Sequence, residues 1–131
     1  IFSSAVKTNT QYMHTIRFSM LLDEVITKEE VVNRIKQDPY IASTLKKSTN
    51  SVFSYGRDHG FYGRIYNQGV ICMPSLSVSH FSDTTKITGF AFTPQDGNSL
   101  LSSVAAALYG FYGKEYKSYL SPLSEYIKDE V

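Results

Sequence analysis

The chain has 131 residues, a length that suits one domain of the commonest size. Its 42% hydrophobic and 19% charged residues are typical of a globular protein and exclude a disordered one. The formal net charge of +1 argues against a dedicated nucleic-acid binder, and the single cysteine, Cys72, excludes an internal disulfide and a cysteine-based zinc site. The single cysteine also indicates a reducing environment, so we expect a cytoplasmic location, and no apolar run approaches the roughly 20 residues that cross a bilayer, so we expect no membrane contact.

The N-terminal half predicts a strand followed by a helix. Apolar and polar residues alternate over residues 11–20, which predicts a half-buried strand. Thr27 and Glu30 have the spacing of a capping box, and Pro39 ends the helix that this box begins. Beyond it we expect one short helical turn within 40–47 and a short strand over 51–55.

The C-terminal half predicts further strands and two helices. The strand candidates are residues 64–73, 75–79 and 86–93. A turn at 94–97 precedes a helix that begins at Asn98 or Ser99, and the small residues 105–107 suggest that this helix packs closely against a sheet. Ser121 and Pro122 predict the start of a last helix, which runs to about Glu130.

This order of elements predicts an α+β fold. We expect a two-layer sandwich, with helices on one face of a mostly antiparallel sheet, as a single domain over residues 1–131. Because the first residue is isoleucine and not methionine, we expect the chain to be a fragment of a longer one.

The segment 48–68 is the strongest candidate for a binding site. It combines glycines, hydroxyl side chains and two arginines, and we expect it to be an irregular loop. Ser51, Arg57 and Arg64 are the predicted anion-binding residues, because arginine forks match phosphate and carboxylate geometrically. The alternative is a solvated loop in which the arginines pair with Asp58 or Asp83.

Histidine and cysteine give weaker signals. His59 lies between Asp58 and Gly60, an arrangement that could orient an imidazole for proton transfer, although a surface histidine in a turn is the commoner case. His80 and Asp83 supply only two potential ligands, so we predict no metal site. Cys72 has apolar flanks and is interpreted as core packing.

Several segments together resemble one family. The pattern formed by Lys7–Thr10, the strand to Met20, Thr27–Val32, Val52–Gly56 and Ile87–Ser99 is similar to the C-terminal, catalytic-domain half of glyceraldehyde-3-phosphate dehydrogenase-like proteins. The resemblance implies that Lys7 takes the place of the substrate-phosphate arginine and that Gln95 lies near the nicotinamide amide. It also implies NAD(P) as cofactor, and a homo-oligomer or a contact with a Rossmann domain.

Two features of that family are missing from the chain. Cys72 does not match the nucleophilic cysteine, which precedes this region in the family. No Gly-x-Gly-x-x-Gly fingerprint follows a strand, so NAD(P) would be bound mainly by sequence outside this chain.

Two functions from different classes therefore remain open. The first is the substrate-side domain of an NAD(P)-dependent aldehyde or phosphosugar dehydrogenase-like protein, supplying an anion-binding loop. The alternative is a non-catalytic α+β module that binds a small anionic ligand, or a protein partner through its tyrosine-rich C-terminus. RNA contact through Arg57, Arg64 and their aromatic neighbours is a third interpretation, and the low net charge counts against it.

Overall fold

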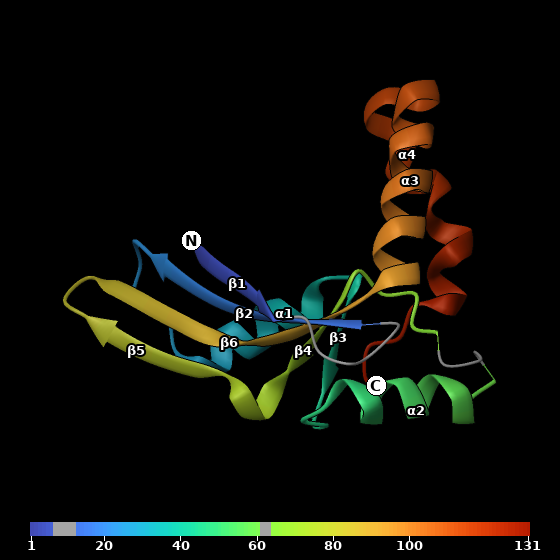
Figure 1. The fold of residues 1–131 in the computed structure, drawn as a ribbon. Helices are drawn as coiled ribbons and strands as arrows, with labels where there is room; N and C mark the ends of the chain where they lie inside the picture. The colour runs from blue at the N-terminus through green and yellow to red at the C-terminus, as the bar shows by residue number, and fades with distance from the viewer. Residues whose placement is uncertain (7–12, 61–63) are drawn as a thin grey trace.

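The computed structural model describes residues 1–6, 13–60 and 64–131, and these form a six-stranded sheet with helices around it (Figure 1). The strands are β1 (Phe2–Val6), β2 (Met13–Leu22), β3 (Ile41–Thr44), β4 (Gly69–Cys72), β5 (Ser77–Phe81) and β6 (Thr84–Pro94). The helices are α1 (Lys28–Gln37), α2 (Thr49–Asp58), α3 (Gln95–Tyr112) and α4 (Tyr116–Tyr119), with 3-10 turns η1 (Met73–Ser75), η2 (Gly113–Glu115) and η3 (Ser121–Tyr126). The strand order is β1-β2-β6-β4-β3, with β5 also paired to β6, and of these pairs only β3–β4 is parallel. The expected α+β class with a mostly antiparallel sheet is confirmed.

The helices α1 and α2 lie on opposite faces of the sheet, which differs from the expected sandwich with helices on one face. The β2–α1–β3 connection crosses β6 and β4 towards one edge, whereas the β3–α2–β4 connection returns from that edge. Crossovers between parallel strands are almost always right-handed, so connections in opposite directions place their helices on opposite faces. The packing agrees with this rule, because Val31 of α1 packs with Ile71 and Ile87, while Val52 of α2 packs with Val70.

The sheet therefore carries two separate apolar cores. Neighbouring residues of a strand point to opposite faces, and β4 divides its side chains accordingly between the α1 side and the α2 side. β6 contributes Ile87 to the α1 core and Phe92 to the α2 core. The long strand β6 thus contributes side chains to both cores, and α1 and α2 cover these cores at different ends of the sheet.

The helix α2 replaces the predicted short strand and irregular loop. Ser48 caps it, because Ser48 Oγ accepts a hydrogen bond from Ser51 N at 3.2 Å. Thr49, Val52 and Gly56 are buried at helical spacing. The predicted helical turn within 40–47 was also wrong: Ile41–Thr44 is strand β3, because its residues pair with β4 and are largely buried.

The last residues return to the edge of the sheet and are not part of the predicted C-terminal helix. After η3 the chain is extended, and Ser43 N donates to Asp129 O at 2.9 Å while Val131 N donates to Ser43 O at 3.0 Å. The fully buried side chain of Asn67 holds the same segment: its Nδ2 donates to Lys128 O at 2.7 Å and its Oδ1 accepts from Lys128 N at 3.2 Å. The first pair of bonds satisfies backbone groups of Ser43 at the outer edge of β3, and the second pair satisfies those of Lys128.

The helix α3 rises away from the sheet, which corrects the expectation that it packs closely against it (Figure 1). It follows β6 directly, and η2, α4 and η3 pack along it. Leu101 near its base is buried, while Ala106 and Ala107 are exposed. In the part of the chain that the structure describes, no helix is both long and apolar enough to cross a membrane.

We predict that Asn67→Ala lowers the free energy of unfolding by about 2–4 kcal/mol, because two backbone groups of Lys128 lose a buried partner. Urea denaturation measures this loss, and amide hydrogen exchange should accelerate at Ser43 and Val131. The exposed Asn33 in α1 offers a matched control, for which Asn33→Ala should change stability by less than about 0.5 kcal/mol. Equal effects of the two substitutions would contradict the assigned role.

The capping box of α1 predicts a loss of stability in acid. Glu30 Oε2 accepts from Thr27 N at 2.7 Å and from Thr27 Oγ1 at 2.9 Å, and these bonds hold the pKa of Glu30 below its usual value of 4.5. A carboxyl group whose pKa is lower in the folded state contributes stability above pH 4.5, and this contribution disappears as the pH falls through the folded pKa. Thermal unfolding from pH 6 to 2 should show a shallower acid slope for Glu30→Gln than for Glu29→Gln.

Candidate functional site

The structure separates the anion-binding residues that were expected in one loop. Ser51 lies in the first turn of α2 and Arg57 in the last, which places them about 9 Å apart along the helix axis. Ser51 Oγ is 2.9 Å from Ser48 Oγ, and Arg57 Nε donates to Asp58 Oδ1 at 2.9 Å. Arg57 therefore has the local acidic partner that the solvated-surface interpretation assigns to it.

His59 ends α2 on an exposed surface. Its ring stacks on Tyr55 at 4.0 Å between centroids, and its Nδ1 lies 2.8 Å from Tyr55 O. Both contacts hold the ring against the last turn of the helix, as expected for a capping side chain. Lys7 lies outside the described residues.

The side chains of His80 and Cys72 also have structural partners. His80 Nε2 lies 2.8 Å from Ile26 O, and Cys72 is buried, with its Sγ 3.4 Å from Lys46 O. Within residues 1–6, 13–60 and 64–131 no group of three or more His, Cys, Asp or Glu side chains could hold a metal ion. Cys72 is thus part of the apolar core on the α2 side of the sheet.

Arg64 and Gln95, by contrast, line one groove at the base of α3. The groove has a volume of about 490 Å³ and is lined by Arg64, Tyr66, Gln95, Ser99, Leu100 and Ser103. Gln95, Ser99 and Ser103 are spaced four residues apart, so they form one row along α3, and Arg64 approaches from the segment before β4. Two residues that the sequence assigned to substrate and cofactor therefore share one surface.

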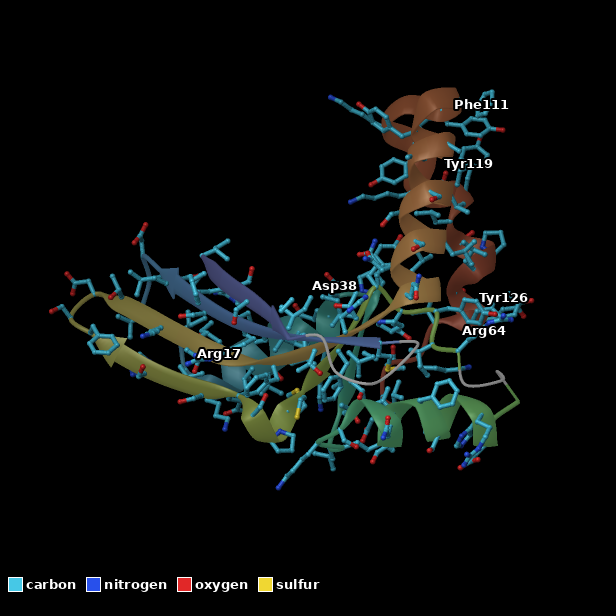
Figure 2. All side chains as sticks on the ribbon, in the orientation of Figure 1. Arg17, Asp38, Arg64, Phe111, Tyr119 and Tyr126 are labelled. Atoms are coloured by element: carbon cyan, nitrogen blue, oxygen red, sulfur yellow. The ribbon has the colours of Figure 1, made fainter. Side chains whose placement is uncertain are left out.

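An apolar pocket of about 220 Å³ adjoins this groove. Its lining consists of Tyr66, Leu100, Leu101, Leu123, Tyr126 and Ile127, of which Tyr66 and Leu100 also line the groove. Tyr66, which lines the groove together with Arg64, makes an edge contact with Tyr126 at 6.1 Å between ring centroids, and Figure 2 labels Arg64 and Tyr126 at the foot of α3. The neighbouring Glu125 raises the pKa of the Tyr126 phenol, by a hydrogen bond and by its charge.

A second cavity lies at the N-terminus of α2, and sequence reasoning missed it because α2 was not predicted. Its volume is about 500 Å³, and its polar lining residues are Thr15, Lys47, Ser48, Thr49, Cys72 and Ser75. Pro74, Phe90 and Phe92 form its apolar wall. The signal that could have revealed it is the Ser48-x-x-Ser51 cap followed by buried positions at helical spacing.

No family model matches the chain, and no curated protein and no solved structure matches it either. The similarity to glyceraldehyde-3-phosphate dehydrogenase-like proteins therefore stays a resemblance of sequence pattern.

Proposed function

We propose that this domain binds a small organic anion, a phosphate or a carboxylate, in the groove between Arg64 and α3. The observation that carries the proposal is that Arg64 and Gln95, which are far apart in the chain, line the same groove. A guanidinium group pairs with both oxygens of a carboxylate or phosphate, while the Gln95 amide can donate to a neighbouring oxygen.

The start of α3 adds donors to this groove. Pro94 precedes the helix and provides no side-chain cap, so the first-turn amides of an 18-residue helix depend on other acceptors. The partial positive charge at a helix N-terminus favours an anion there. The hydroxyls of Ser99 and Ser103 extend the row of hydrogen-bonding groups along the same face.

The adjoining pocket indicates that the ligand also has a carbon body. Leu100 and Tyr66 line both the groove and the apolar pocket. A ligand anchored at Arg64 in the groove would therefore extend directly to the apolar side chains of the pocket. Contact with Leu123 and Ile127 would remove apolar surface from water. A short-chain organic phosphate or carboxylate fits this combination better than a bare inorganic ion does.

The resemblance to the dehydrogenase-like family supports a more specific form of the proposal, in which the domain is the substrate side of an NAD(P)-dependent enzyme. In that form the groove holds the anionic end of an aldehyde or phosphosugar, and Gln95 lies towards the cofactor amide. The sequence lacks the glycine fingerprint of a dinucleotide site, and Cys72 is buried, so in this form NAD(P) and the nucleophile would be supplied mainly by sequence outside this chain. Another domain or a second copy would then contact this one, and the end of α3, where Phe111 is 84% exposed, is available for it (Figure 2).

We predict that Arg64→Ala weakens the binding of glyceraldehyde 3-phosphate at least about tenfold, because a charge-assisted hydrogen-bond pair is lost. Isothermal titration calorimetry measures the change. Arg57→Ala is the matched control and should leave the affinity within about twofold, since Arg57 pairs with Asp58 on another surface. Equal losses for both variants, or none for Arg64→Ala, would refute the groove as the binding site.

A further inference from the structure

The cavity at the start of α2 has the position of a ligand site in an α/β crossover. It lies where the parallel strands β3 and β4 end, beside the first turn of the helix that connects them. In this geometry the backbone amides at the helix start point out beyond the sheet. Position alone does not identify a ligand, and the side chains inside the cavity provide the independent evidence.

Thr49 is a largely buried polar residue of this cavity. It is only 7% exposed, yet its hydroxyl has no hydrogen bond to the residues that the structure describes. The other buried polar side chains all have one: Ser43, Thr44, Asn67 and Thr85 bond to backbone groups. Every fully enclosed polar side-chain atom in the described residues is partnered, so the Thr49 hydroxyl keeps some access to solvent, and Thr49 is one of the residues that line the cavity.

The charge inside the cavity favours an anion. Lys47 is the one charged residue that the described part of the chain contributes to its lining, and no carboxylate lines it there. The amides of Thr49 and Asn50 begin α2 and have no acceptor within the helix. An anion beside Thr49 would therefore meet a hydroxyl, backbone amides and an ammonium group together.

The opposite wall favours a flat apolar group. Phe90 and Phe92 stand on the same face of β6 as Thr15 of β2, and Pro74 lies next to them around the cavity. Phe90 is 41% exposed, which leaves part of its ring open for contact. Aromatic rings pack favourably against other flat groups at offset or edge-on geometry.

We propose that this cavity binds an aryl phosphate or aryl carboxylate, with the anionic group at Thr49 and Lys47 and the ring against Phe90. The site is separate from the Arg64 groove and does not depend on the function proposed for it. The two differ in their elements, because one lies at the start of α2 and the other at the start of α3.

Titration with phenyl phosphate tests the proposal, with inorganic phosphate as the comparison ligand. We expect phenyl phosphate to shift the amide NMR signals of residues 48–52 and to bind at least about tenfold more tightly than inorganic phosphate. Lys47→Ala and Thr49→Val should each weaken binding about tenfold. Lys36→Ala, at an exposed site on α1, is the matched control and should leave the affinity unchanged.

Thermal unfolding separates a binding role of Thr49 from a structural one. Thr49→Val removes a hydroxyl that bonds to none of the described residues, so the melting temperature should change little while phenyl phosphate affinity falls. A lower melting temperature with unchanged affinity would overturn the proposal. So would amide shifts confined to the Arg64 groove, or phenyl phosphate binding that Arg64→Ala abolishes, since either result would assign the ligand to the other site.

Discussion

The handedness of two crossovers around β3 determines most of this architecture. The chain passes from β2 to the outer strand β3 and then turns back to β4, so the two connections run in opposite directions across the sheet. Right-handed crossovers in opposite directions need opposite faces, which gives α1 one core and α2 the other. The same reversal places the N-terminus of α2 at the ends of β3 and β4, where the cavity containing Thr49 lies.

A second constraint is the return of the C-terminal residues to β3. The backbone bonds to Ser43 and the Asn67 clamp on Lys128 fix where residues 128–131 lie. η3 must therefore descend beside the base of α3, which brings Leu123 and Ile127 next to Leu100. The apolar pocket next to the Arg64 groove thus depends on hydrogen bonds just beyond the C-terminal end of η3.

Local patterns in the sequence were sufficient to predict some helices and strands and not others. The alternation before Met20 and the capping box of Thr27 and Glu30 predict β2 and the start of α1, because both signals act within a few residues. The glycines after Tyr55 suggested an irregular loop, but Gly56 lies inside α2 on its buried side. β3 escaped prediction because its four residues become a strand only through pairing with β4 and with the C-terminal segment.

For the candidate sites too, the sequence indicated some features, while others depend on the folded structure. Arg64 and Gln95 could be chosen as ligand-binding types from sequence, yet their shared groove depends on where β4 and α3 start, which is a long-range property. Thr49 gave no signal at all, because a hydroxyl that bonds to no other side chain or backbone group is recognisable only when its surroundings are known. The resemblance to a dehydrogenase-like family adds roles for Lys7 and Gln95, and these stay predictions.

The charge distribution explains how a domain with a net charge of +1 could still select anions. Arg34 and Arg57 are paired with Glu24 and Asp58 at 2.6 and 2.9 Å, so these charges are largely compensated at the surface. The groove and the α2 cavity each contain one basic side chain and the start of a helix, and no carboxylate from the described residues lines either one. With almost no net charge to attract ligands over long distances, association would proceed without electrostatic steering. Selectivity for anions would then arise after contact, from hydrogen bonds that an uncharged ligand of the same shape could not accept as strongly.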